Sequence, residues 1–181
     1  MVSIAVSEFI LVIAALVIGL VIFGLTEAVI VPQYGFTLAE QQARTLATTT
    51  FISISPPAIG ASGYSYVIYP YIPGFEGNVS IFIFEVPTSL LSSVAVLTPQ
   101  SSSPTFTASY PNGTSLSKIT IGPVYDTNGH ELATSLTAYT VPANMPLVIT
   151  GTLPKNYALM IWVIYNSGNY YFRIAYAYTT G

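Results

Sequence analysis

The side chains that could carry out chemistry are few and scattered. His130, the only histidine, lies in the segment DTNGHEL with Asp126 and Glu131. A histidine beside carboxylates could bind a metal or act as a general base. Asn128-Gly129 between them is a turn signal, so we interpret His130 as a loop residue. Asp126, Asn128 and Glu131 also resemble part of a calcium loop, but the full twelve-residue pattern is absent.

The other acidic residues form no recognisable catalytic set. Glu76 and Glu85 would make a glycosidase pair only if the fold brought carboxylates together, and no sequence feature indicates this. The chain has no G-x-S-x-G, H-E-x-x-H, P-loop or G-x-G-x-x-G motif, and it has no cysteine for thiolate chemistry. We therefore predict no catalytic residue, no metal site and no cofactor, and we do not expect an enzyme.

The composition excludes one class of partner. The 181 residues carry a net charge of −3 with only four Lys or Arg, and 6% are charged, against about 25% in ordinary soluble domains. So few cations cannot neutralise a phosphate backbone, and we do not expect nucleic-acid binding.

The N-terminal part of the chain predicts an apolar helix. Seventeen consecutive apolar or glycine residues, Phe9 to Leu25, lie between Glu8 and Glu27. Because apolar side chains fill every face, apolar matter must surround the helix. The run would measure roughly 26 Å, just short of a ~30 Å hydrocarbon core. It lacks the basic n-region and small-residue cleavage site of a secretory signal, and no Lys or Arg precedes Arg44.

The helix is expected to change character after this run. Pro32 and Gly35 predict a kink or local melting over residues 29–36. Thr37 and Glu40 form a T-x-x-E capping box at which helix should resume. An apolar stripe should then lie on a globular domain, made of Leu38, Ala39, Ala43, Leu46 and Ala47. The polar residues Gln41, Gln42 and Arg44 are expected to turn outward.

The remainder of the chain predicts short strands separated by Pro, Gly, Asn and Ser. The candidate strands are Tyr64–Tyr69, Asn78–Val86, Ser93–Thr98, Thr105–Tyr110, Ser117–Ile121, Thr134–Val141, Leu147–Thr152, Tyr157–Tyr165 and Tyr170–Tyr178. The turn NSGN should join the last two as a hairpin. In the final strand, one face should carry Tyr170, Phe172, Ile174, Tyr176 and Tyr178, and the other Tyr171, Arg173, Ala175 and Ala177.

This pattern predicts an α+β protein with two parts. Residues 1–50 form a long hydrophobic helix, and residues 51–181 form an all-β, immunoglobulin-like sandwich. Two N-x-[ST] sequons, at Asn78 and Asn112, are candidate N-glycosylation sites if the chain is exported.

The segment SEFILVIAALVIGLVIFG, its proline-interrupted continuation and the β-rich remainder together resemble type IV pilins, and the all-β head resembles the archaeal branch. The resemblance implies a structural subunit of an extracellular, homopolymeric pilus that serves cell adhesion. The implied partners are further copies of the chain, the membrane before assembly, a prepilin peptidase and the pilus assembly machinery. Family pilins lose a short basic leader, and the lack of one here fits a mature chain.

The resemblance assigns the assembly contacts to the apolar helix. We expect them at Glu8, Phe9, Leu11, Leu16, Leu20 and Phe23. In bacterial relatives the glutamate is the fifth mature residue, so either the mature start here is Ile4 or this lineage differs. A buried carboxylate needs a partner, and Arg44 is roughly 50 Å away along a helix. The amino terminus of a neighbouring subunit is one candidate; the alternative is that Glu8 marks the end of a membrane span beside Ser3 or Ser7.

Two other interpretations stay open. An archaellin of a motility filament would share the helix-plus-sandwich plan. A singly membrane-anchored surface binding protein would use the same helix as a permanent span. That class is expected to carry flanking basic residues and a flexible tether, whereas this chain has only TEAVIVPQYGF before helix resumes.

Overall fold

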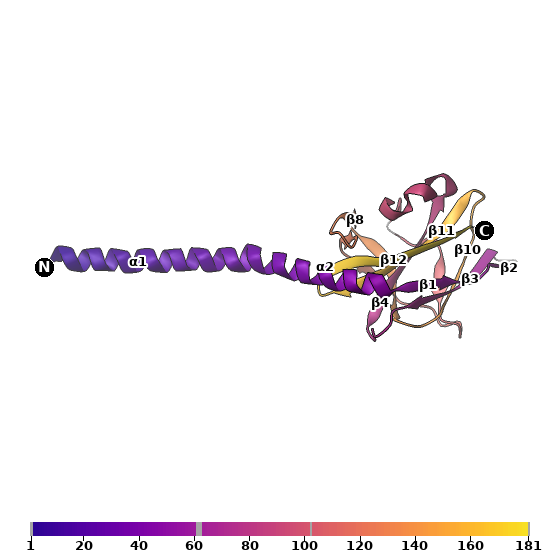
Figure 1. Cartoon of the computed structure of the whole chain (residues 1–181), viewed down its shortest axis with the longest axis horizontal. Coiled ribbons are helices and arrows are strands. Elements are labelled where there is room, and N and C mark those ends of the chain that lie inside the picture. The colour runs from indigo at the N-terminus through magenta and orange to yellow at the C-terminus, as the bar shows by residue number, and fades with distance from the viewer. Residues whose placement is uncertain (1, 61–62, 102, 181) are drawn as a thin grey trace. The chain divides into compact units, whose positions relative to one another are not determined.

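The computed structural model describes residues 2–60, 63–101 and 103–180. The helical part consists of α1 (Val2–Leu25), the π-helical turn η1 (Thr26–Ile30) and α2 (Val31–Thr49), labelled in part in Figure 1. The chain divides into two compact units, Met1–Leu38 and Ala39–Gly181. The division lies inside α2, not at the predicted residue 50. Ala39 and Ala43 of α2 are buried, so the second half of this helix belongs to the β domain.

The helix accommodates Pro32 without melting. The backbone N–H of Val31 donates to the carbonyl of Thr26, five residues earlier, which closes a wide π turn directly before the proline. Such a turn gives room to a ring that would clash in a regular α-helix. Pro32 and Gly35 both lie within α2. The irregularity expected near Pro32 is the π turn that comes before it, and the predicted local melting over residues 29–36 is wrong.

Because the helix is continuous through Thr37, the predicted capping box does not form. The Thr37 hydroxyl donates to the carbonyl of Gln33, at 3.0 Å, as an internal helical residue does. Glu40 instead forms an ion pair with Arg44 one turn later. A box that begins a helix has no role where the preceding residues are already helical.

The β domain contains two sheets. The five-stranded sheet has the order β1–β3–β10–β5, with β2 also paired to β3; its strands are β1 (Phe51–Ile54), β2 (Ala58–Gly60), β3 (Gly63–Tyr71), β10 (Leu147–Gly151) and β5 (Thr107–Ser109). The seven-stranded sheet has the order β6–β9–β4–β11–β12–β7–β8; its strands are β6 (Lys118–Ile121), β9 (Leu136–Pro142), β4 (Asn78–Pro87), β11 (Tyr157–Ser167), β12 (Tyr170–Thr180), β7 (Val124–Tyr125) and β8 (Glu131–Ala133). The α+β prediction is confirmed.

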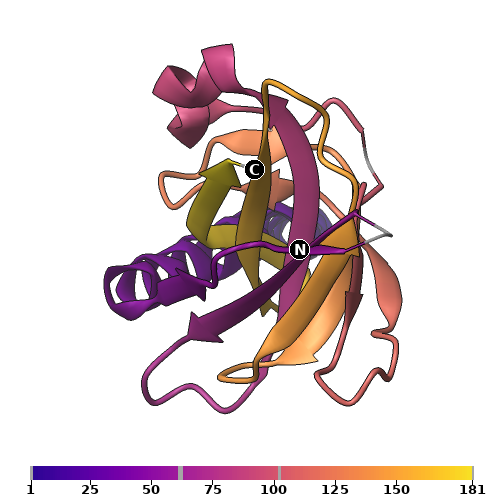
Figure 2. The same ribbon diagram turned by 90° about the vertical axis from the view of Figure 1, so that its right-hand side faces the viewer.

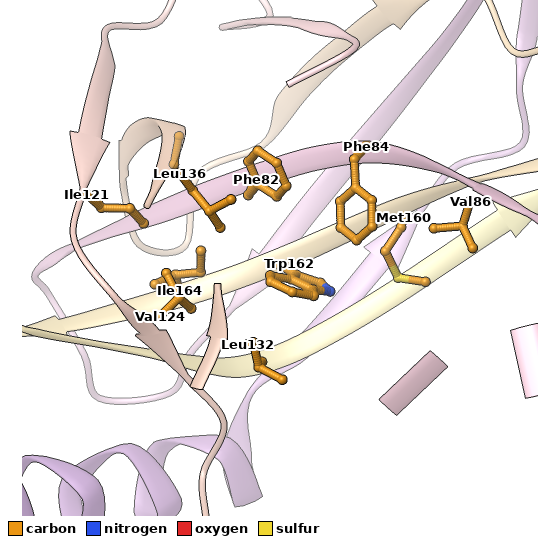
Figure 3. Packing of buried hydrophobic residues seen from close by; sticks show 11 residues of the cluster. Phe82, Phe84, Val86, Ile121, Val124, Leu132, Leu136, Met160, Trp162 and Ile164 are labelled. Carbon is orange, nitrogen blue, oxygen red and sulfur yellow. The ribbon is translucent and has the colours of Figure 1, made fainter. Parts of the chain in front are cut away.

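The two central strands of the larger sheet are buried on both faces. Every residue of 79–84 in β4 and of 158–164 in β11 is buried. Continuous apolar runs are typical of strands covered on both sides. On one face Phe82, Phe84 and Trp162 pack edge to face or tilted, within the cluster drawn in Figure 3. The opposite face carries the alternate residues, such as the paired Ile83 and Ile161.

A short 3₁₀ segment, η2 (Thr88–Val96), covers part of this cluster and lies beside β4 (Figure 2). The strand predicted at Ser93–Thr98 is therefore wrong. Leu91, Val94 and Leu97 pack against the cluster, from both sides of a kink at Ser93, where the backbone is not helical.

A β-bulge changes which way the side chains of β12 point. Val163 of β11 pairs with Ala175, and the next residue, Ile164, pairs with Arg173, which leaves Ile174 as the extra residue. Phe172, Arg173 and Ile174 are consequently all buried, whereas Tyr176 and Tyr178 are exposed. The predicted single face from Tyr170 to Tyr178 is wrong because the alternation restarts at the bulge.

The second half of α2 packs on the β domain, as predicted, with Ala39 and Ala43 buried and Leu46 and Ala47 half-buried, but Leu38 of the predicted stripe is exposed. Its polar residues take part too: Arg44 Nε donates to the carbonyl of Thr127 at 2.6 Å. The Gln42 amide oxygen accepts hydrogen bonds from the hydroxyls of Tyr165 and Ser167, at 3.2 and 3.3 Å. The expectation that Gln42 and Arg44 only face outward is therefore wrong, since both hold the helix to loops and strand ends.

Candidate functional site: the apolar helix

The helix α1 exposes apolar side chains in every direction. The predicted assembly residues Phe9, Leu11, Leu16, Leu20 and Phe23 are each between 63% and 71% exposed. At about 100° per residue, four of them fall in one sector about 60° wide, and Leu11 lies about 150° away from its centre. Both sides of the helix thus offer large apolar surfaces, as the sequence predicted, and none of these five side chains is covered by the chain itself.

The described residues contain one helix that is long and apolar enough to cross a membrane, Val6–Thr49. The criterion is length and composition, which signal sequences and core helices also meet. A core helix would be mostly buried, however, and no residue in the most apolar window of this helix is buried. The helix therefore needs a bilayer or other protein around it.

Two carboxylates flank the apolar run. Glu8 lies in α1 just before Phe9, Glu27 lies in η1, and both side chains are exposed. Among the described residues, no Lys, Arg or His lies within ion-pair distance of either carboxylate. Arg44 is already engaged by Glu40 and by the carbonyl of Thr127. Any ion-pair partner of Glu8 must come from outside the described residues.

Asp126 and His130 form a turn, not a reactive centre. The Asp126 carboxylate accepts hydrogen bonds from the backbone N–H groups of Asn128 and His130, each at 2.8 Å, and lies 3.2 Å from His130 Nδ1. Burial alone would raise the pKa of Asp126, but these hydrogen bonds outweigh it and lower the pKa. His130 lies in the loop between β7 and β8, as predicted.

The two other carboxylates considered lie at opposite ends of β4. Glu76 lies two residues before the strand and Glu85 near its end, so the strand from Asn78 to Glu85 alone accounts for a separation of roughly 23 Å. This exceeds the spacing of about 5–9.5 Å between glycosidase carboxylates. Burial raises the pKa of Glu85. Within the described residues, no three His, Asp or Glu side chains gather in a group that could hold a metal ion.

The two sequons differ in structure. Asn112 lies in an exposed turn, where its side-chain oxygen accepts the backbone N–H of Thr114 at 2.9 Å and Gly113 N–H donates to Tyr110. Asn78 is the first residue of β4 and is exposed, but its sequon partner Ser80 is only 3% exposed. A glycosylating enzyme that acts on the folded chain would reach the whole sequon only at Asn112.

We therefore expect glycosylation at Asn112. If the chain is exported by a host that attaches N-glycans, intact-mass measurement of the purified chain should show one glycan, which Asn112→Gln removes. The matched variant Asn78→Gln should leave the mass of the attached glycan unchanged. A mass equal to that of the bare chain, or a loss caused by Asn78→Gln alone, would contradict this expectation.

Comparison of the chain with protein-family models, curated proteins and solved structures finds no match in any of the three. The resemblance to archaeal type IV pilins therefore rests on the apolar helix, its early glutamate and the β domain that follows. The immunoglobulin-like assignment of that domain also stays a prediction.

The sequence did not reveal a buried arginine in the β domain. The Arg173 guanidinium lies 5.0 Å from the ring centres of both Trp162 and Tyr176 and donates from Nη2 to the carbonyl of Ala95 at 2.6 Å. Burial lowers its pKa, opposed by Tyr176 and Asp126. Arg173 thereby ties η2 to β12. A lone arginine in the apolar run YYFRIAYAY was the only available signal.

Proposed function

We propose that this chain is the structural subunit of an extracellular, homopolymeric filament of the archaeal type IV pilus kind. The observation that carries the proposal is α1, whose large apolar side chains are exposed on opposite faces with no covering segment among the described residues. In a bundle of many copies, each helix would be covered by its neighbours on all sides.

The energetics favour a bundle over an isolated helix in water. At about 25 cal/mol per Å² of apolar surface, burying a helix that is apolar on every face contributes on the order of tens of kcal/mol before entropy costs. Before assembly, the same helix can lie in a membrane, for which its length and composition suffice. The partners of this route are other copies of the chain, the membrane, a prepilin peptidase and an assembly machinery.

The β domain would form the filament exterior and carry adhesion. Its own core is closed, with Trp162 and the surrounding cluster buried, so it needs no partner to hide apolar surface there. Because only 6% of the residues of the chain are charged, the charge of a hydroxyl-rich exterior would change little with pH or salt. These features support a surface-exposed structural role, and none of the carboxylate pairs considered above has a catalytic geometry.

Electron microscopy of the purified chain tests the proposal. We expect negatively stained fibres of uniform width when the full chain is purified from the cell surface or polymerised from detergent. Dispersed particles that remain soluble only in detergent would instead indicate a singly anchored surface protein. Fibres that rotate on tethered cells would assign the filament to motility instead of adhesion.

A further inference from the structure

A cavity of about 370 Å³ lies in the β domain where the ends of several strands meet. Tyr64 comes from β3, Thr88 from η2 and Thr180 from β12, while Lys155, Asn156 and Tyr157 come from the connection into β11. This volume is within the range of roughly 300–1,000 Å³ found for small-molecule sites. No residue of α1 lines the cavity.

The loop that provides three of these residues is ordered by backbone contacts. Tyr157 N–H donates to the carbonyl of Pro154 at 3.1 Å, and Thr88 N–H donates to the carbonyl of Asn156 at 2.9 Å. Asn156 has a left-handed backbone with φ of 66°, a conformation that asparagine tolerates better than most residues. These backbone contacts therefore fix the positions of Lys155 and Asn156 at the cavity.

No hydrogen bond or ion pair links six polar side chains at the cavity to other described residues; they are Tyr64, Thr88, Lys155, Asn156, Tyr157 and Thr180. The ring of Tyr64 stacks on that of Tyr66, with 6.2 Å between the ring centres. Elsewhere in the domain, polar turn residues such as Asn112, Asp126 and Asn144 bond the backbone. Together the six side chains offer hydroxyl, carboxamide and ammonium groups for a ligand rich in hydroxyls.

The charge of the residues that line the cavity indicates which class of ligand it could bind. Of the four basic residues, Arg44 pairs with Glu40, Arg173 bonds Ala95, and Lys118 lies 5.3 Å from the ring centre of Tyr139. Lys155 alone makes no such contact among the described residues. Among the described residues that line the cavity there is no carboxylate, and Lys155 carries the one formal charge. An anionic group of a ligand would meet an ammonium that no described carboxylate pairs.

We infer that this cavity binds an anionic saccharide, a pyranose that carries a carboxylate or a sulfate group. The tyrosine rings offer apolar faces to the C–H surface of the sugar, the hydroxyls and Asn156 bond its hydroxyl groups, and Lys155 pairs with its anion. Adhesion of the filament to acidic polysaccharide would follow. This inference rests on the proposed function, because it names the class of ligand that the adhesive filament would bind.

Binding of defined sugars to the full chain tests the inference. Methyl galacturonoside, a sulfated methyl galactoside and neutral methyl galactoside are titrated at millimolar concentration and followed by ligand-observed NMR. The titration is run on fibres and on the detergent-solubilised chain, so that a failure to polymerise is seen separately from a failure to bind. We expect binding of at least one of the two anionic sugars in both preparations and weaker binding of the neutral sugar.

Two variants assign the binding to the cavity. Lys155→Met keeps most of the length of the side chain but removes its charge, and should weaken binding of the anionic sugar by about tenfold, because a hydrogen bond to a charged group is lost. Tyr157→Ala should weaken binding of acidic and neutral sugars alike. The matched control Lys118→Met removes one positive charge outside the cavity and should change nothing.

Several outcomes would overturn the inference. They are the absence of binding to either anionic sugar, equal loss in Lys155→Met and Lys118→Met, and neutral galactoside binding as tightly as the anionic sugars. N-acetylaspartate that binds as tightly as galacturonoside would show a carboxylate site without sugar recognition. Fibres that fail to form while the solubilised chain still binds sugar would leave the cavity assignment standing and reject the filament.

Discussion

A chain that lacks residues 1–31 should be a soluble monomer with a folded β domain, whereas the full chain polymerises or requires detergent. The deletion removes α1 and η1, which carry most of the exposed large apolar side chains. Their burial between subunits contributes on the order of tens of kcal/mol gross, so no other contact is expected to replace it. The unit Ala39–Gly181 keeps its own buried core.

Two measurements check this result. Sedimentation velocity gives the size of the truncated chain in buffer without detergent. Trp162, the only tryptophan, is fully buried, so blue-shifted fluorescence that moves to the red in denaturant reports an intact core. The full chain in the same buffer is the control. A truncated chain that still polymerises would show that the helix is not the assembly element.

Local signals in the sequence were sufficient for the long elements. β11 and β12 were predicted at Tyr157–Tyr165 and Tyr170–Tyr178 and are observed at Tyr157–Ser167 and Tyr170–Thr180. Their apolar and aromatic runs are long, and the turn between them contains Gly168 with φ of 62°, a conformation that suits glycine. Strong propensity and a compatible turn reinforce each other there, so no distant contact is needed to specify the hairpin.

Distant contacts decide the elements that the sequence misjudged. β1, β2, β7 and β8 have between two and four residues each and were not predicted, because so few residues show no period. η2 adopts a 3₁₀ conformation because Leu91, Val94 and Leu97 find an apolar cluster to cover. The bulge at Ile174 is defined by pairing with β11, which no local pattern in β12 reveals.

The same distinction applies to the candidate sites. The apolar helix is visible in the sequence because all its chemistry is contiguous. The cavity around Lys155 is not, because its six polar residues come from four segments between residues 64 and 180 that only the fold brings together. Arg173 was predicted on the face of β12 opposite Tyr176, but the bulge brings both to the same side, and Arg173 is buried beside Trp162 and Tyr176.

The second large effect is expected on changing Glu8, because assembly would place its carboxylate next to apolar side chains of neighbouring α1 helices. A carboxylate in such surroundings costs several kcal/mol unless it is paired or hydrogen-bonded. None of the described basic residues pairs with it, and Arg44 has its own partners. Under the proposed function, the amino terminus of a neighbouring subunit supplies the charge, and the pair fixes how far one helix is shifted along the next during assembly.

Glu8→Gln should therefore slow filament growth by about tenfold or more while the unassembled chain stays stable in the membrane. The substitution keeps the shape of the side chain and removes the charge, so it loses one charge-assisted contact between subunits, and each 1.4 kcal/mol corresponds to about tenfold. Glu27→Gln is the matched control, since it removes the same charge from an exposed residue just beyond the other end of the apolar run. Quantitative microscopy of fibres per cell, with immunoblotting of the membrane-held chain, measures both effects.

Normal fibres from Glu8→Gln would mean that Glu8 marks only the end of a membrane span. An equal defect in both variants would mean that net charge, and not a specific pair at Glu8, controls assembly.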